Sequence, residues 1–269
     1  MSADKPLALV TGASSGIGFE LAKQLAERGF DLVVNAEDSA RLRQAAEQFR
    51  AAGARVEVVR ADLRVREETE ALFATAVSLG RPLDVVALNA GVGRGGAFAD
   101  TDLEDELEIV DLNVRSTVHL AKLVVRDMVA RDAGRVLVTS SIASTTPGSF
   151  QAVYNASKSF LQSFTEALRN ELKDTGITVT SLMPGPTETD FFHRADMDDT
   201  KVGRQDKDDP AQVARQGLDA LLSGKPKLVA GSLRTKAQGV AGKVLPDTAK
   251  AEAHRKMAEP GSGDSGSTG

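Results

Sequence analysis

The residues best suited to chemistry in this chain of 269 residues are Tyr154, its single tyrosine, and Lys158, four positions later. On a helix that begins near Ala152, the two side chains lie on one face, about 5–6 Å apart. A free phenol titrates at about pH 10, but an adjacent ammonium group favours the phenolate and lowers the pKa of the phenol. The pair is therefore suited to general acid–base catalysis. So short a motif also occurs where the tyrosine is merely buried and the lysine solvated, so the surrounding sequence must decide.

A second chemical feature is the glycine-rich segment TGASSGIG, which follows the apolar run LALV at 7–10 and precedes an amphipathic segment. A strand, a glycine turn and a helix N-terminus together form an anion site, because backbone N–H groups and the positive end of the helix dipole meet there. Gly12, Gly16 and Gly18 let the backbone approach a pyrophosphate closely. The alternative is a tight turn without a ligand. We interpret the segment as a dinucleotide site.

The elements that must position these residues alternate regularly along the chain. Nearly continuous, β-branched apolar runs predict buried strands at 7–10, 31–35, 55–59, 83–88, 134–140, 177–182 and 227–230. Amphipathic segments predict helices near 17–28, 39–52, 65–79, 102–131, 152–173, 210–222 and 233–255. This alternation predicts an α/β fold with a single doubly wound parallel sheet of about seven strands and helices on both faces.

One domain, residues 1–257, accounts for this pattern. Residues 189–209 are polar and acidic apart from Phe191 and Phe192, and predict a mobile surface insertion. Residues 258–269 are rich in glycine and serine, and predict a disordered tail.

Composition excludes several functions. The net charge of −5 comes with interspersed acids and bases, which argues against nucleic-acid binding. The absence of cysteine excludes thiolate metal sites and suits a reducing compartment, and the three histidines are too far apart in sequence to predict a metal site. No apolar run reaches membrane-spanning length or resembles a signal peptide, so we expect a cytoplasmic protein without a membrane partner.

Several motifs, in this order, resemble those of the classical short-chain dehydrogenase/reductase family. They are Thr11-Gly12-x-x-x-Gly16-Ile17-Gly18, Asn89-Ala90-Gly91, Asn113, Ser141, Tyr154-x-x-x-Lys158 and Pro184-Gly185. The resemblance covers roughly residues 5–230. It implies a Rossmann-type fold, a nicotinamide dinucleotide as cofactor, and the interconversion of a secondary alcohol and a ketone by hydride transfer.

The resemblance also implies roles for individual residues. Tyr154 is expected to exchange a proton with the substrate oxygen, while Lys158 lowers its pKa and holds the nicotinamide ribose. Ser141 is expected to hydrogen-bond the same substrate oxygen, and Asn113 to support a water that links Lys158 to solvent. Ser140 competes with Ser141, since only family spacing separates the two serines.

Further cofactor contacts are implied at the ends of successive strands. The expected contacts, besides Tyr154 and Lys158, are Gly12, Ser14, Ser15, Gly16, Ile17, Gly18, Glu37, Asp62, Leu63, Asn89, Ala90, Gly91, Pro184, Gly185 and Thr187. Asp62 is either an adenine contact or a helix cap. Asn89 either braces adjacent loops or contacts the cofactor, and Thr187 is a candidate for the nicotinamide carboxamide. Because parallel strands end at one edge of the sheet, these residues should converge on one crevice.

The second predicted strand ends in acidic residues, which bear on the choice of nicotinamide. Glu37 lies nineteen residues after Gly18 (37 − 18 = 19), and Asp38 adds a second carboxylate. An acid at this distance can hydrogen-bond a ribose 2′-OH, whereas a 2′-phosphate needs a basic partner. Many NADP-using relatives have an arginine near this position or a basic residue in place of Ser15. We therefore expect NAD, with NADP as the alternative if Arg41 or Arg43 reaches a phosphate.

The substrate pocket is expected from Ile142, Ala143, Pro147, Phe150 and the 189–209 insertion, with Val92 to Phe98 as further candidates. Their mostly apolar character predicts a medium-sized carbonyl or alcohol substrate, which Arg94 or Arg194 could approach from the loops. Helices near 102–131 and 152–173 have apolar residues on more than one face, and in the family these helices pair across a two-fold axis. We therefore expect a homodimer or homotetramer.

Two other functions fit parts of this sequence. A non-catalytic dinucleotide sensor would keep the glycine turn, but such proteins typically lack the tyrosine or lysine that this chain retains. An epimerase or dehydratase that recycles its cofactor typically has a different glycine spacing and a larger C-terminal substrate domain. Only 111 residues follow Lys158 here (269 − 158 = 111), which disfavours this reading.

Overall fold

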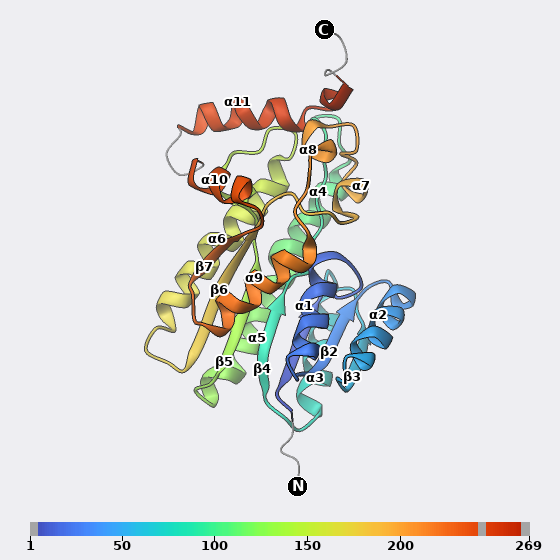
Figure 1. Cartoon of the computed structure of the whole chain (residues 1–269), viewed down its shortest axis with the longest axis vertical. Coiled ribbons are helices and arrows are strands. Elements are labelled where there is room, and N and C mark those ends of the chain that lie inside the picture. Colours follow the sequence, from blue (N-terminus) through green and yellow to red (C-terminus); the bar gives the residue numbers. More distant parts are fainter. Residues whose placement is uncertain (1–4, 242–245, 265–269) are drawn as a thin grey trace.

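The computed structural model describes residues 5–241 and 246–264 (Figure 1). Seven parallel strands form one sheet in the order β3-β2-β1-β4-β5-β6-β7. The strands are β1 (Leu7–Thr11), β2 (Asp31–Ala36), β3 (Val56–Arg60), β4 (Leu83–Leu88), β5 (Gly134–Thr139), β6 (Ile177–Pro184) and β7 (Lys227–Ala230). This architecture confirms the predicted doubly wound fold.

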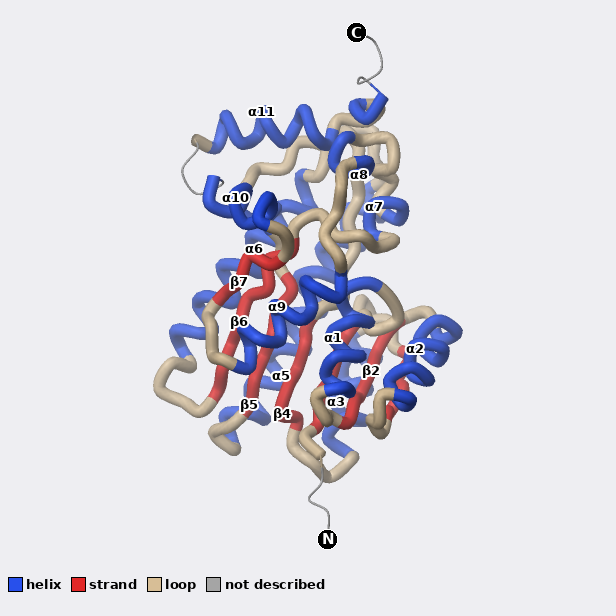
Figure 2. Tube along the Cα trace, in the orientation of Figure 1, coloured by secondary structure: helices blue, strands red, loops and turns tan. Residues whose placement is uncertain are grey.

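Helices cover both faces of the sheet (Figure 2). The helices before the sixth strand are α1 (Gly16–Glu27), α2 (Ser39–Ala51), α3 (Arg66–Ser78), α4 (Leu103–Ile109), α5 (Ser116–Ala130) and α6 (Ala152–Glu171). Those after it are α7 (Phe191–Arg194), α8 (Lys201–Arg204), α9 (Pro210–Leu222), α10 (Leu233–Ala241) and α11 (Asp247–Ala258). No helix in the described part of the chain combines the length and apolar character needed to cross a membrane.

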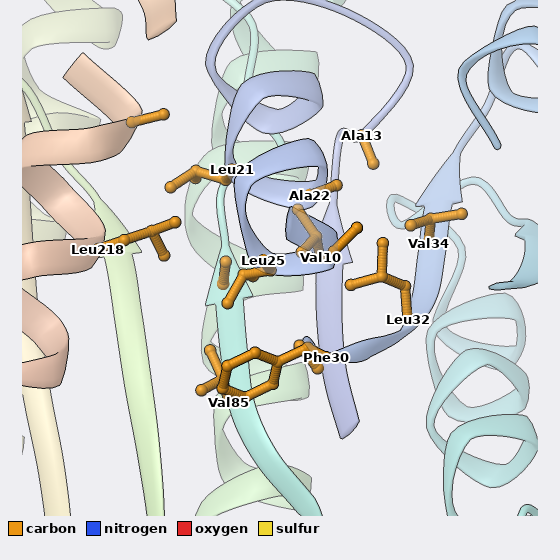
Figure 3. Close-up of a cluster of buried hydrophobic side chains, with 14 of the residues drawn as sticks. Val10, Ala13, Leu21, Ala22, Leu25, Phe30, Leu32, Val34, Val85 and Leu218 are labelled. Atoms are coloured by element: carbon orange, nitrogen blue, oxygen red, sulfur yellow. The ribbon is translucent and has the colours of Figure 1, made fainter. Parts of the chain in front are cut away.

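The position of β1 in the sheet explains why residues 7–10 are all apolar. Leu9 pairs with Val33 of β2 and Val86 of β4, so β1 has a neighbour on each edge. Its alternate residues Ala8 and Val10 pack under α1, α2 and α9, in the cluster of which Figure 3 shows a part. Leu7 and Leu9 pack on the opposite side, beneath α3, α5 and α6. A strand buried on both faces accepts a polar side chain only where that side chain is hydrogen-bonded, as Thr11 is, which explains the apolar run at 7–10.

Two predicted helices are each divided in the structure. The segment expected as one helix over 102–131 contains a π-helical turn, Val110–Arg115, between α4 and α5. The segment expected over 233–255 forms α10 and α11, with residues 242–245 outside the described residues. Pro246 immediately precedes α11 and lacks the N–H group that a continuous helix would need.

The expected surface insertion at 189–209 is partly buried instead. Phe192, Ala195 and Met197 are buried in a small hydrophobic cluster that includes Ala258, at the end of α11. Three apolar residues in a polar segment have too little periodicity to predict this packing from sequence.

The first residues of the expected disordered tail also make contacts. Backbone N–H groups of Gly261 and Gly263 donate to the Asp199 side chain and backbone carbonyl, at 2.6 and 2.8 Å. Residues 265–269 lie outside the described residues.

The glycine turn after β1 depends on a close backbone contact. A Cβ atom on Gly18 would lie 2.1 Å from the carbonyl oxygen of Gly12, far inside van der Waals contact. We expect Gly18→Ala to lower the free energy of unfolding by about 3 kcal/mol, the upper end of overpacking costs, because the backbone itself must move. Urea denaturation measures this change.

Gly80→Ala is the matched control for that measurement. Gly80 has a positive φ of 67°, but a Cβ atom there would have no neighbour within 4 Å. This variant should lose about 1 kcal/mol from backbone strain alone. A loss at Gly18 no larger than the loss at Gly80 would contradict the proposed steric constraint.

Candidate active site

The carboxyl ends of β1, β2, β4, β5 and β6 border one cavity of about 900 Å³. In open α/β sheets ligands bind at this edge, and the cavity volume lies within the range of about 300–1,000 Å³ typical of ligand sites. Every residue predicted to contact the cofactor lines the cavity, namely Gly12, Ser14, Ser15, Gly16, Ile17, Gly18, Glu37, Asp62, Leu63, Asn89, Ala90, Gly91, Tyr154, Lys158, Pro184, Gly185 and Thr187. The predicted residues therefore lie together, whereas their individual contacts with a ligand stay predictions.

The turn between β1 and α1 forms a concave backbone wall of this cavity. Gly12 and Gly16 have φ angles of 66° and 57°, which residues with a side chain rarely adopt. A Cβ atom on Gly16 would approach Cγ2 of Thr189 to 2.9 Å. Within the described chain, the side chain of Ser15 makes no capping hydrogen bond to α1. The first backbone N–H groups of α1 therefore remain available to an anion.

Tyr154 and Lys158 lie one turn apart on α6 and both border the cavity. The Lys158 Nζ atom lies 5.7 Å from the centroid of the Tyr154 ring and donates to the carbonyl of Thr139 at 3.1 Å. Lys158 is only 5% exposed, while Tyr154 is half-buried. The Phe191 ring packs against the Tyr154 ring with centroids 5.2 Å apart. The phenol and the amine are thus held side by side at the cavity wall.

The two neighbouring serines have different surroundings. The Ser140 hydroxyl is buried and donates to the Lys158 backbone carbonyl at 3.0 Å. The Ser141 hydroxyl accepts from the N–H of Ala143 at 3.1 Å, donates to the Pro184 carbonyl at 3.5 Å, and lies close enough to the Tyr154 phenol to oppose the rise in its pKa. Geometry therefore places Ser141 beside the phenol, in agreement with the family spacing.

Asn113 lies within the π-helical turn. Unlike the other predicted site residues, it is not among the described residues that line the cavity. Its side chain is fully buried, accepts from the N–H of Val92 at 2.9 Å, and donates to the Val92 carbonyl and to the Ser157 hydroxyl. A Cβ atom on Gly91 would touch both Asn113 Oδ1 and Lys158 Nζ, at 3.0 and 3.4 Å. Asn113 thus braces the chain next to Lys158, and its link to solvent through water stays a prediction.

Asn89 joins three strands at the cavity edge. Its N–H donates to the Thr11 hydroxyl at 2.9 Å, its amide nitrogen donates to the Thr11 carbonyl, and its amide oxygen accepts from the Thr139 hydroxyl at 3.0 Å. These contacts favour the bracing role that the sequence left open.

Asp62 is not the cap of α3, because the residue before that helix is Val65. The Asp62 carboxylate accepts instead from the backbone and side chain of Arg64, at 3.0 and 2.8 Å. The hydrogen bond from Arg64 holds the pKa of Asp62 below its usual range, although burial opposes this.

The two acidic residues after β2, Glu37 and Asp38, make different contacts. Glu37 borders the cavity and pairs with Arg64 at 2.8 Å, whereas Asp38 caps α2 by accepting from the N–H groups of Ala40 and Arg41. The Arg41 side chain, considered above as a partner for a 2′-phosphate, instead forms an ion pair with Asp190 at 2.9 Å. Among the described residues that line the cavity, Arg60 is the only arginine near these acids, and it pairs with Glu68.

Comparisons with known proteins now decide the family. The model of the short chain dehydrogenase family matches residues 6–200. Dehydrogenase/reductase SDR family member 4 of Bos taurus is 34% identical over 70% of this chain and 68% of its own. A short-chain dehydrogenase of Sphingobium yanoikuyae in complex with NADPH is 27% identical, covers 88% of this chain and 93% of its own, and has a TM-score of 0.79.

This chain belongs to the short-chain dehydrogenase family. It is therefore an NAD(P)-dependent oxidoreductase, as the resemblance implied. A 3-ketoacyl-(acyl-carrier-protein) reductase of Brucella melitensis in complex with NADH is a further similar structure, with 25% identity and a TM-score of 0.76. It covers 87% of this chain and 100% of its own. Similar structures thus contain either nicotinamide.

In this short-chain dehydrogenase, one wall of the cavity is formed by residues that follow the segment 6–200 matched by the family model. One face of α11 contributes to this wall, through Lys250, Ala253, His254 and Met257. The helix is anchored to the loop before α6, since Lys250 donates to the Thr145 carbonyl and His254 Nδ1 contacts the Ser149 carbonyl, both at 3.0 Å. The sequence does not predict this wall, and its histidines are considered above only as possible metal ligands. The i, i+3, i+4, i+7 spacing of these four residues was the available signal.

The remaining pocket expectations are partly wrong. Ile142, Ala143 and both Phe191 and Phe192 line the cavity, together with Arg194. Pro147, Phe150 and Phe98 are not among the described residues that line it. Phe150 instead packs on the cluster around Phe192, Phe98 is 64% exposed, and Arg94 pairs with Asp105 and Asp196.

The pKa of the phenol differs from the expectation in this cofactor-free structure. Burial raises the pKa of Tyr154 to about 12, against a smaller lowering by the hydrogen bond with Ser141. Burial also lowers the pKa of Lys158 to about 8. Desolvation disfavours the charged form of both groups. In the protein alone burial therefore outweighs any lowering of the Tyr154 pKa by Lys158, and the lowered pKa expected in the cofactor complex stays a prediction.

A direct titration tests this balance. At pH 10, where a free phenol is about half ionised, we expect Tyr154 to stay almost wholly protonated in the cofactor-free enzyme. The chain has one tyrosine and no tryptophan, so the ultraviolet absorbance of phenolate reports on this residue alone. Circular dichroism at each pH verifies that the sample is folded. A half-ionised phenol at pH 10 in a folded sample would show that burial does not control this group.

Proposed function

We propose that this enzyme interconverts a secondary alcohol and a ketone, with Tyr154 as the general acid and base. The observation that carries the proposal is the convergence of Tyr154, Ser141 and Lys158 at one wall of the cavity that also contains the glycine turn. A dinucleotide fits the geometry of that turn, whose positive-φ glycines and uncapped helix N-terminus leave a cradle of N–H groups. When bound, the nicotinamide would supply hydride transfer at the carbon that bears the substrate oxygen.

The chain's own residues supply the matching proton transfer. In the reductive direction Tyr154 donates its phenolic proton to the substrate oxygen, and in the oxidative direction it removes that proton. Ser141, which lies beside the phenol, holds the same oxygen. Lys158 has a pKa of about 8, so it is mostly protonated at neutral pH and can stabilise the phenolate. We therefore propose that the pKa of Tyr154 falls once a dinucleotide is bound, through Lys158.

We propose that different parts of the dinucleotide contact different groups of residues along the cavity. Gly12, Gly16 and Gly18 would hold the pyrophosphate, Asp62 and Leu63 the adenine, and Glu37 the adenosine ribose. The segment Pro184 to Thr187 would border the nicotinamide, with Lys158 on its ribose. An acid in the position of Glu37 favours a ribose 2′-OH over a 2′-phosphate, so we propose NAD as the preferred cofactor.

The substrate and assembly follow from the remaining surfaces. The apolar lining by Ile142, Ala143 and Phe191 supports a medium-sized, largely apolar carbonyl or alcohol substrate. Exposed apolar side chains on α4, the π-helical turn, α5 and α6 support a homodimer or homotetramer through these helices; they include Leu103, Leu107, Val110, Val118 and Phe160. The cysteine-free composition supports a cytoplasmic location.

Removing the phenolic hydroxyl tests the proposed mechanism. Tyr154→Phe should lower kcat by about 100- to 10,000-fold, the usual contribution of general acid–base catalysis, because the proton has no donor. Affinity for NADH should change little. Nicotinamide absorbance with a panel of ketones and secondary alcohols measures turnover, and NADH fluorescence measures binding.

Ser163→Ala is the matched control for this measurement, since it also removes one hydroxyl and Ser163 is exposed on the same helix. This control should keep full turnover. Unchanged turnover in Tyr154→Phe would refute the assignment of the acid. Tight cofactor binding without turnover in the parent enzyme would instead indicate a dinucleotide sensor.

The two serines give a second test. Ser141→Ala should reduce kcat by about tenfold or more, because loss of a hydrogen bond to a charged or partly charged oxygen costs about 1.5–3 kcal/mol. Ser140→Ala should keep kcat within a few-fold and lower the free energy of unfolding by about 1 kcal/mol, since its buried hydroxyl bonds only backbone. Steady-state kinetics and urea denaturation of both variants separate these effects. The reverse pattern would assign the substrate contact to Ser140.

A further inference from the structure

Arg64, in the connection between β3 and α3, lies among three carboxylates. Its guanidinium pairs with Glu37 and Asp62, each at 2.8 Å, and also with Glu108. The side chain is 28% exposed, and its backbone carbonyl accepts from Arg115 at 2.6 Å. Arg64 is therefore held from several sides directly behind Glu37 and Asp62, which border the cavity, although Arg64 itself is not among the described residues that line it.

The contact between Arg64 and Glu37 places a cation at the proposed ribose position. Glu37 borders the cavity, and the Nη2 atom of Arg64 lies 2.8 Å from its Oε1 atom. Any group that took the place of this carboxylate oxygen would meet the same guanidinium. The other arginines near this position are paired with other carboxylates: Arg41 with Asp38 and Asp190, Arg60 with Glu68, and Arg115 with Asp111.

We propose that the Glu37–Arg64 ion pair sets the selectivity between NAD and NADP, with Arg64 as a 2′-phosphate ligand that Glu37 masks. The inference rests on the proposed function, since it assumes that adenosine lies at Glu37. It adds a specificity residue from the connection between β3 and α3 to the acid that follows β2.

The physical basis is competition for one guanidinium. In the parent enzyme the Glu37 carboxylate occupies an N–H group of Arg64 and repels a doubly charged phosphate. Glu37→Gln removes the charge and frees part of the guanidinium fork, whose geometry matches phosphate oxygens. Asp62 and Glu108 remain bound to Arg64, so the guanidinium keeps its place when Glu37 changes.

A double-mutant cycle tests the proposal. The proteins are the parent, Glu37→Gln, Arg64→Met and the double variant, each titrated with NADH and NADPH by nicotinamide fluorescence, with kcat/KM ratios as a second readout. Glu37→Gln should strengthen NADPH binding by about 10- to 100-fold, since hydrogen bonds to charged groups have this value. The double variant should lose most of that gain, because the two residues act as a unit.

Two further variants make the cycle specific. Arg64→Lys in the Glu37→Gln background keeps the charge and the fold while it removes the planar fork, and should retain only part of the gain. Arg41→Met in the same background should retain all of it, which excludes the neighbouring arginine. If Arg64→Met does not fold, the lysine variant still decides the question, because a full gain there contradicts a fork-specific contact.

The outcomes separate this inference from the proposed function. A gain in NADPH affinity that survives loss of Arg64 would show that Glu37 acts by repulsion alone, and would overturn the inference while cofactor binding stands. An unchanged NADPH affinity in Glu37→Gln would also overturn it. Absence of binding of either nicotinamide by the parent would overturn the proposed function and this inference with it.

Discussion

The active site depends on the close approach of two backbones where β1 and β4 end. The Thr11 hydroxyl accepts from the N–H groups of Asn89 and Ala90 and donates to the Ala87 carbonyl. A Cβ atom on Gly12 would lie 3.0 Å from the Ala90 Cα atom. The glycine turn can therefore lie against β4 only without a side chain at this position. This contact sets the position of the glycine turn relative to the strand ends that border the cavity.

The pKa values at the two ends of the cavity are controlled by different effects, burial at one end and ion pairing at the other. At the catalytic wall burial dominates, so the pKa of Tyr154 is raised and that of Lys158 is lowered. At the adenosine end the carboxylates lie near cations, and the pKa of Asp62 is lowered by its hydrogen bond with Arg64. The cavity thus has a neutral phenol beside the Lys158 ammonium at one end and paired ions at the other.

Sequence patterns predicted the parts of this enzyme that depend on local spacing. Apolar runs such as LALV predicted the strands, and the sheet then brought Gly12, Asn89 and Tyr154 to one edge, as parallel topology requires. Contacts between distant segments could not be predicted in this way. The pairing of Arg64 with Glu37 joins residues 27 positions apart at the ends of two strands, and no local period encodes it. The pKa of Tyr154 likewise depends on burial, which only the packed structure reveals.

Helix α11 contributes to the wall of the cavity but carries none of the residues proposed for proton transfer. Tyr154 and Lys158 on α6, and Ser141 just after β5, lie within the residues matched by the family model, whereas Ala253 and Met257 on α11 line the same cavity from outside that match. Side chains on this helix can therefore vary in size without disturbing the acid–base geometry. The shape of the cavity and the proposed acid–base chemistry are thus encoded in different parts of this chain.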